Sequence, residues 1–283
     1  MITCLLDFAV PLENRHGLSL FHFLSGQWQL SVIFEKLHKI RRKMKKVVII
    51  AIGAVVLVQG VFAADAKWES TVAAGLNLTS GNSDTMAANA SVNAEKAGDV
   101  HEIRLGAEGN FGESTINEVD ETTTQNAKAV AIYKRKFNEF FLYSDNSIFH
   151  DKMTDVDSRL ILGIGVGRRL FENDNTKLDI ELGAAYISEE LANDPSDDYA
   201  AARFAFRHDQ NLSDSSKLWL SAEYMPNVDD FEDYLLNGEA GLEAALNSSL
   251  SLRVVLQNRY DSTVPADREN NDLSVISSLV YKL

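Results

Sequence analysis

The chain has 283 residues, of which 45% are hydrophobic and 24% charged, and its formal net charge is -14. This composition excludes a disordered chain and a bundle of membrane-spanning helices. The acidic balance also argues against a nucleic-acid partner, because phosphate binding needs clustered Lys and Arg and no such cluster follows Lys46. The only cysteine is Cys4, which excludes a disulfide framework or a thiolate metal site in the rest of the chain.

A secretory signal is predicted near the N-terminus. After Met44, two lysines precede an apolar run over 47–58 and small residues that fit cleavage after Ala63. The run is shorter than the roughly 20 residues that a helix needs to cross a bilayer. We therefore predict a cleavable signal peptide over 44–63 and an exported domain over 64–283. Residues 1–43 are interpreted as an incorrectly assigned upstream extension, with Met44 as the true start; a translated extension is the alternative.

Beyond Ala63 the apolar residues recur with period 2, which is typical of strands that have one apolar and one polar face. Ile180 and Leu182 share one face, for example, whereas Asp179 and Glu181 share the other. The pattern predicts twelve strands, over 67–79, 85–97, 100–111, 122–136, 139–150, 158–171, 176–188, 199–210, 217–226, 234–246, 249–261 and 273–283.

The length and number of these strands indicate a fold class. Each strand reaches the roughly 9–11 residues that a tilted strand needs to cross a bilayer, and bacterial barrels have even strand numbers. Short turns and longer connections largely alternate along the chain, as they do in outer-membrane barrels. We therefore predict an all-β fold, a transmembrane antiparallel up-and-down β-barrel in a bacterial outer membrane. The rival is a soluble barrel or sandwich, whose apolar face would point inward.

The polarity of the chain departs from simple alternation in two ways. The apolar alternation is blurred near 123–135 and 139–149, so the register of those strands stays open. The five longer connections, 112–121, 151–157, 189–198, 227–233 and 262–272, carry 19 acidic and 2 basic residues. They predict an acidic outer rim that attracts divalent and other cations.

The acidic outer loops singled out as candidate cation sites contain Asp155, Asp157, Asp197, Asp198, Asp229, Asp230 and Asp233. Solvated loop carboxylates are the alternative interpretation, because the spacing of an EF-hand loop is absent.

The polar strand faces contain charged residues of both signs, which are predicted to line the lumen. In a pore, such groups tune the selectivity for ions or solutes; alternatively, they pair into a salt-bridged plug. The sequence leaves both interpretations open. The predicted lumen-lining residues are Glu69, Glu102, Arg104, Glu108, Asp145, Arg159, Arg169, Asp179, Glu181, Arg203, Arg207, Glu223, Glu239, Glu243, Arg253 and Arg259.

No catalytic motif is present, and we expect neither an enzyme nor a cofactor. The glycines at 163, 165 and 167 do not fit the spacing of a dinucleotide-binding loop; we interpret them as positions of close approach or strand bending. Histidines at metal-ligand spacing and a G-x-S-x-G elbow are both missing. An enzyme acting on envelope lipids, using His208 on the apolar face, is a distant third hypothesis.

The segments 75–85 (GLNLTSGNSDT), 141–170 and 260–281 resemble the domain of unknown function 481 family, the YdiY-like salt-induced outer membrane proteins. The resemblance implies an outer-membrane barrel and a link to salt or envelope stress, without a defined activity. The last strand resembles an assembly signal, which implies outer-membrane lipid and the barrel-assembly machinery as partners. It ends in Leu283, where the family commonly has an aromatic residue.

Two functional hypotheses follow. The first is a porin-like narrow channel for small solutes or ions. The second is a non-conducting structural barrel of the cell envelope, whose acidic outer loops bind divalent cations or neighbouring surface components.

Overall fold

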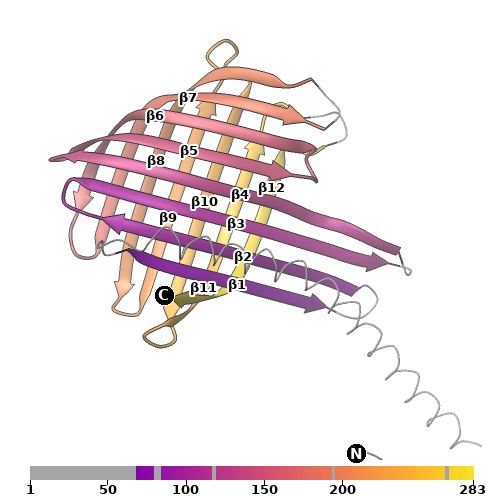
Figure 1. Cartoon of the computed structure of the whole chain (residues 1–283), viewed down its shortest axis with the longest axis horizontal. Coiled ribbons are helices and arrows are strands. Elements are labelled where there is room, and N and C mark those ends of the chain that lie inside the picture. The colour runs from indigo at the N-terminus through magenta and orange to yellow at the C-terminus, as the bar shows by residue number, and fades with distance from the viewer. Residues whose placement is uncertain (1–67, 80–83, 117–118, 193–194, 265–267) are drawn as a thin grey trace, which may run out of the picture. The chain divides into compact units, whose positions relative to one another are not determined.

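The computed structural model describes residues 68–79, 84–116, 119–192, 195–264 and 268–283, which form a closed ring of twelve antiparallel strands (Figure 1). Each strand pairs with its neighbours in the sequence, and β12 closes the ring on β1. The strands are β1 (Glu69–Thr79), β2 (Asp84–Ala97), β3 (His101–Ile116), β4 (Val119–Phe137), β5 (Phe140–Asp151), β6 (Val156–Glu172), β7 (Thr176–Leu191), β8 (Asp197–Ser213), β9 (Ser216–Pro226), β10 (Tyr234–Ala245), β11 (Leu250–Asp261) and β12 (Asn271–Lys282).

The prediction of a twelve-stranded up-and-down barrel is thereby confirmed. The predicted signal peptide and upstream extension lie outside the described residues. No helix in the described part of the chain is long and apolar enough to cross a membrane.

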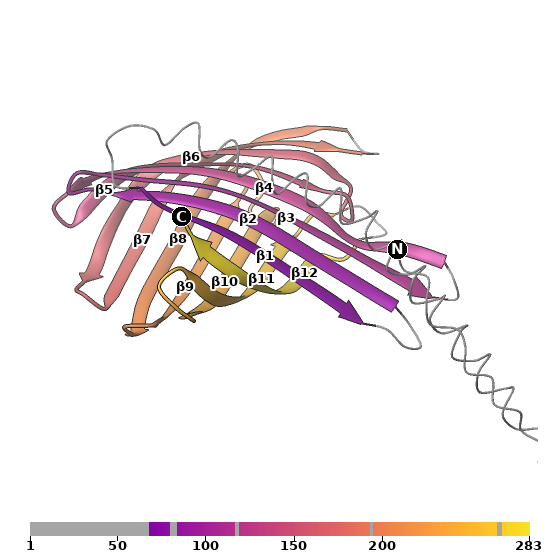
Figure 2. The same cartoon turned by 60° about the horizontal axis from the view of Figure 1, so that its bottom comes forward.

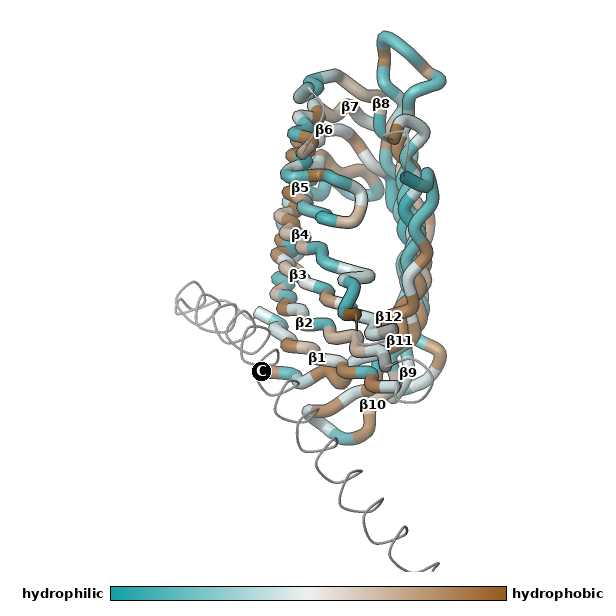
Figure 3. The backbone as a smooth tube through the Cα atoms, turned by 90° about the vertical axis from the view of Figure 1, so that its right-hand side faces the viewer, coloured by the Kyte–Doolittle hydropathy of each residue, from teal (hydrophilic) through white to brown (hydrophobic). Residues whose placement is uncertain are grey.

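The barrel has two ends, which we name for what they carry. The short turns at 98–100, 138–139, 173–175, 214–215 and 246–249 lie with the C-terminus at the terminal end. The remaining connections lie at the loop end. Seen from the side, β3 to β5 belong to one wall and β9 to β12 to the opposite one, with the interior between them (Figures 2 and 3).

The outer face of the barrel is apolar. On β6, Ile164 is 66% exposed and Val166 52%, whereas Arg203 on β8 is 4% exposed and points inward. The same arrangement recurs on the other strands, where outward residues include Leu182, Phe204, Leu242, Val254 and Val275. Soluble monomers rarely expose an apolar surface of this extent. The predicted alternation is confirmed, and the apolar residues face outward. The alternative of a soluble barrel or sandwich is wrong, because it requires these residues to face inward.

Two predicted loops are largely strand. β3 and β4 remain paired as far as Ile116 and Val119, and β7 and β8 as far as Glu189 and Asp197. Beyond the apolar belt the backbone ladder continues while polar side chains occupy both faces, so the alternation that marks a strand in the sequence disappears.

The predicted acidic loops need a corresponding correction. Asp157 lies in β6, and Asp197 and Asp198 lie in β8, because the strands extend to these residues. Asp155 does lie in a connection, between β5 and β6, and Asp229, Asp230 and Asp233 lie in the connection between β9 and β10.

Aromatic rings of the inner face lie on glycines of the neighbouring strand. Phe141 pairs with Gly167 and Trp219 with Gly241. A Cβ added to Gly167 would lie 2.2 Å from Phe141 Cζ, and one added to Gly241 would lie 1.9 Å from Trp219 Cζ2. Such positions accept only glycine unless the ring moves, which is the close approach expected for the β6 glycines.

Candidate functional site

The interior of the barrel contains a cavity of about 600 Å³, lined by residues from most of the strands. Ten acidic and nine basic side chains line it, so the wall is nearly balanced in charge. Of the predicted lumen residues, the cavity wall includes Glu69, Glu102, Arg104, Glu108, Asp145, Asp179, Glu181, Arg203, Arg207, Glu223, Glu239, Arg253 and Arg259.

The other three predicted residues lie beside this wall. Arg159 lines a smaller cavity of about 70 Å³ toward the loop end. Arg169 ion-pairs with Glu102 and Asp179. Glu243 ion-pairs with Arg253, with 2.6 Å between Arg253 Nη2 and Glu243 Oε2.

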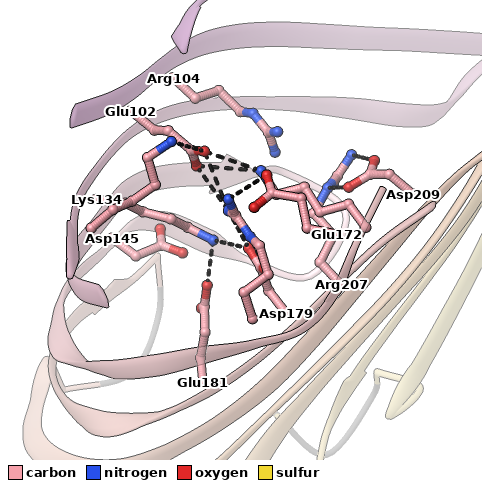
Figure 4. A network of polar contacts seen from close by, with 12 residues as sticks. Glu102, Arg104, Lys134, Asp145, Glu172, Asp179, Glu181, Arg207 and Asp209 are labelled. Atoms are coloured by element: carbon pink, nitrogen blue, oxygen red, sulfur yellow. Dashed lines mark hydrogen bonds and ion pairs between the residues drawn. The ribbon is translucent and has the colours of Figure 1, made fainter. Parts of the chain in front are cut away.

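Near the terminal end, two buried carboxylates organise a cluster of cations (Figure 4). Glu102 Oε1 lies 3.2 Å from Arg169 Nη2, 3.3 Å from Lys177 Nζ and 3.5 Å from Lys136 Nζ. Asp179 accepts a bond of 2.8 Å from Arg169 Nε and one of 3.1 Å from Lys134 Nζ. We call this the lower cluster; it consists of Glu102, Lys134, Lys136, Arg169, Lys177 and Asp179.

Midway along the barrel, one guanidinium on β8 is bonded to three other strands. Arg203 donates to Glu223 Oε2 at 2.6 Å, to Glu181 Oε2 at 2.8 Å and to Asp145 Oδ2 at 2.8 Å. Those carboxylates come from β9, β7 and β5, and Arg203 also stacks on the ring of Tyr143. A guanidinium has five N–H donors in a planar fork, which allows one side chain to serve all three acids.

At the loop end, an ion pair crosses the barrel. Arg159 on β6 donates through Nε to Glu189 Oε2 at 2.6 Å, and through Nη2 to Asp261 on β11. Since four strands, β7 to β10, separate β6 from β11 along the shorter path around the ring, this contact spans the interior rather than following the wall. We call Arg159, Glu189 and Asp261 the upper bridge.

The upper bridge lies on the loop-end side of the main cavity. All three residues line the smaller cavity, which shares Lys128, Arg259 and Glu223 with the larger one. A further pair joins two connections at this end, because Arg268 Nη2 lies 2.6 Å from Asp155 Oδ2.

Sequence reasoning missed several interior polar groups: Lys128, Lys134, Lys136, Lys177, Glu189, Asp261 and the indole of Trp219. The three β4 lysines lie where the alternation was blurred, because Val130 and Ile132 share the inner face with them. Their common even numbering is the signal that could have placed them. Lys128 has no carboxylate oxygen within 4.0 Å among the described residues, and its electrostatic interaction is with Asp145 at a longer distance.

The acidic connections form local contacts. Asp233 accepts a bond from Asn227 Nδ2 at 3.0 Å, and Asp230 accepts one from the Glu232 backbone N–H at 3.0 Å. In the described part of the chain, no group of three or more His, Cys, Asp or Glu side chains has an arrangement that could hold a metal ion. Cation binding by these connections therefore stays a prediction.

An apolar outer face and an ion-paired polar interior define a class, the membrane-spanning β-barrel, because in a bilayer only a closed sheet can satisfy the backbone of every strand. The chain belongs to the family described as "Protein of unknown function, DUF481", whose match covers residues 72–283.

Solved structures with a similar chain path include several porins and channels. The COG4313 outer membrane channel from Pseudomonas putida F1 is 9% identical, with 78% of this chain and 97% of that chain covered and a TM-score of 0.47. The NanC porin is 7% identical, with 76% and 96% covered and a TM-score of 0.44. The KdgM porin is 11% identical, with 76% and 98% covered and a TM-score of 0.40. No curated protein matches the sequence.

Proposed function

We propose that the protein is a narrow channel of the bacterial outer membrane that passes small solutes or ions through the barrel interior. The observation that carries this proposal is the charge-lined cavity of about 600 Å³, which runs from residues near the terminal end, such as Lys217, to Arg259 near the loop end. A wall of ten acidic and nine basic groups suits small polar solutes of either sign better than it suits one sign alone.

The upper bridge is the constriction in this proposal. Its contact between Arg159 and Asp261 crosses the interior, and it lies between the main cavity and the loop-end opening. Neutralising Arg159 with a smaller side chain removes both the contact across the interior and the bulk of a fixed guanidinium. Conduction is therefore expected to depend on this bridge more than on any pair along the wall.

The second candidate function is a non-conducting structural barrel, and the contacts across the interior favour it. Arg159–Asp261 and Arg259–Glu108 each join strands that are not neighbours, as a salt-bridged plug would. In this alternative the outer acids bind divalent cations or surface components. The link to salt or envelope stress, the lipid and assembly partners, the absence of catalysis and export through a signal peptide belong to either proposal.

Planar-bilayer recordings separate the two functions. The channel proposal expects step conductance from the purified protein and a larger unitary conductance from Arg159→Gln. Arg168→Gln is the matched control, because Arg168 lies outside the interior cavity wall, beside the exposed Glu139; its conductance is expected to equal that of the unchanged protein. Silence of all three proteins, with β-structure intact by circular dichroism, would contradict the channel.

A further inference from the structure

The ring of strands closes through a short seam. β1 and β12 are joined by four residue pairs, from Thr71↔Lys282 to Ala74↔Leu279, whereas every other neighbouring pair of strands in the described chain is joined by at least nine. Beyond Ala74, and among the residues that the structure describes, 75–79 of β1 pair with β2 alone and 271–278 of β12 with β11 alone. The backbone edges of the two strands are thus not paired with each other in the loop-end half of the wall, and we call the place between these two edges the slit.

A side chain holds the base of this slit. Asn89 on β2 extends over Gly75 and donates from Nδ2 to the backbone oxygen of Ser277 at 3.2 Å. A Cβ on Gly75 would lie 2.0 Å from that same oxygen and 2.5 Å from Asn89 Nδ2. Because residue 75 is glycine, the Asn89 side chain of β2 can reach across β1 to β12. There it donates to the Ser277 carbonyl in place of a backbone N–H of β1.

Inside the barrel, one ion pair lies behind the seam. Arg259 on β11 and Glu108 on β3 are joined at 3.4 Å and so link the strands on the two sides of β12, β1 and β2. Both side chains are partly exposed to the cavity, so the pair contributes little to holding the two sides of the seam together.

The faces of the slit differ in polarity. Its outer side carries Leu76, Leu78, Leu273 and Val275, all at least half exposed. Strand alternation places Asn77, Thr79 and Ser274 on the inner side, together with the apolar Ile276. An unpaired strand edge in hydrocarbon costs several kcal/mol per group, so the edges need a polar occupant that also tolerates the bilayer.

We propose that the slit between β1 and β12 is a lateral portal that admits a single-chain amphiphile, with its polar head among the inner residues and its acyl tail along the outer ones. The proposal goes beyond conduction, because a barrel whose interior passes no ions could still hold an amphiphile at its wall. The polar head replaces the missing backbone partners, and the tail lies against the exposed leucines and Val275.

Pairs of introduced thiols test whether the slit exists. If the four-pair register continued, Leu78 would pair with Val275 just as Ala74 pairs with Leu279, and all four side chains face outward. In a Cys4→Ser background, the double variant Ala74→Cys/Leu279→Cys is expected to oxidise rapidly and the double variant Leu78→Cys/Val275→Cys slowly. Equal rates for the two variants would overturn the portal, because they would show a fully paired seam.

A photoreactive probe tests the occupant. The probe is a lysophosphatidylcholine with a diazirine in its acyl chain, added to the full chain in phosphatidylcholine vesicles. We expect labelling of 75–79 and 271–276 above that of the outer face of β6 around Ile164. The excess should be lost in the double variant Leu78→Cys/Val275→Cys once a bifunctional thiol cross-linker joins the two strands across the slit.

Two results would contradict the amphiphile. Uniform labelling of the outer face would show that the slit holds no more lipid than the rest of the wall. Intermolecular cross-links of the single variant Leu78→Cys, in place of lipid labelling, would assign the slit to a second copy of the chain and would also overturn the proposal.

Discussion

At the scale of single residues, Arg203 shows how the interior tolerates so many charges. Its guanidinium is nearly inaccessible to solvent and is bonded to three carboxylates on three strands. Burial of an isolated charge is strongly unfavourable, whereas a charge with a full set of bonded partners is tolerated. The pairs therefore depend on one another, and loss of the shared cation leaves Asp145 and Glu223 without it, while Glu181 keeps Lys134 at 2.7 Å.

Arg203→Met is expected to lower the free energy of unfolding at neutral pH by about 3–5 kcal/mol, because the acids lose their common partner. The deficit should shrink as the pH falls, since protonation removes the repulsion between the remaining carboxylates. Urea titrations in vesicles at several pH values measure it. The control is Arg168→Met, whose exposed pair with Glu139 accounts for at most about 1 kcal/mol. A deficit that is the same at every pH would contradict this account.

At the scale of strands, pairs of an aromatic residue and a glycine shape the inner wall. The ring of Trp219 lies over Gly241, and its indole Nε1 donates to Glu239 Oε1 at 2.5 Å on the same neighbouring strand. The guanidinium of Arg253 also lies against this ring. The glycine thus allows β9 and β10 to hold a large side chain flat against the wall, which keeps the cavity open.

Gly241→Ala should lower the free energy of unfolding by about 1–3 kcal/mol, because the added methyl group displaces the Trp219 ring. Tryptophan fluorescence followed through a urea titration reports both the stability and the environment of the ring. Gly238→Ala on the same strand is the matched control, because a Cβ there meets nothing within 4 Å; its effect should stay within about 0.5 kcal/mol. Equal effects of the two substitutions would show that close approach is not the cause.

The accuracy of the sequence predictions also differs between elements. On β6 and β7 the residues Arg169, Asp179 and Glu181 lie on the face that alternation assigns to them, because most residues of the opposite face are apolar and exposed. β4 was blurred because its inner face carries Val130 and Ile132 beside lysines. The ends of β3, β4, β7 and β8 were missed because a ladder surrounded by water imposes no polarity on either face.

At the scale of the whole molecule, the apolar belt determines where the barrel can reside. Outward side chains around the middle of β6 are among the most exposed apolar groups in the described chain, and they belong to a surface of leucine, isoleucine, valine and phenylalanine. In water this surface would drive aggregation, and in a bilayer it meets acyl chains.

Ile164→Arg places a cation at the midpoint of β6 and is expected to destabilise the folded barrel in vesicles by about 2–4 kcal/mol. Leu170→Arg, near the terminal end of the same strand, should destabilise it by no more than about 1 kcal/mol. Unfolding free energies in vesicles give the comparison. A barrel that resides in water would accept both exposed arginines equally, and that result would remove the membrane-spanning assignment.

The ion pairs across the interior lie beyond what the sequence could predict. Periodicity assigns Arg159 to an inner strand face, but its contact with Asp261, 102 positions away, depends on how the opposite walls approach each other across the interior. The same holds for the seam, because alternation along β1 and β12 does not specify how many of their residues pair with each other.

The unequal strand lengths have a consequence for how molecules reach the barrel. β4 has 19 residues and β9 has 11, and both are bounded by a short turn at the terminal end, so one side of the wall has about 25 Å more strand than the other. The rim at the loop end therefore has a low side over β9 to β12 and a high side at β3 and β4. A charged solute that arrives from bulk water on the high side therefore meets the acidic ribbon of β3 and β4 before it reaches the rim over β9 to β12.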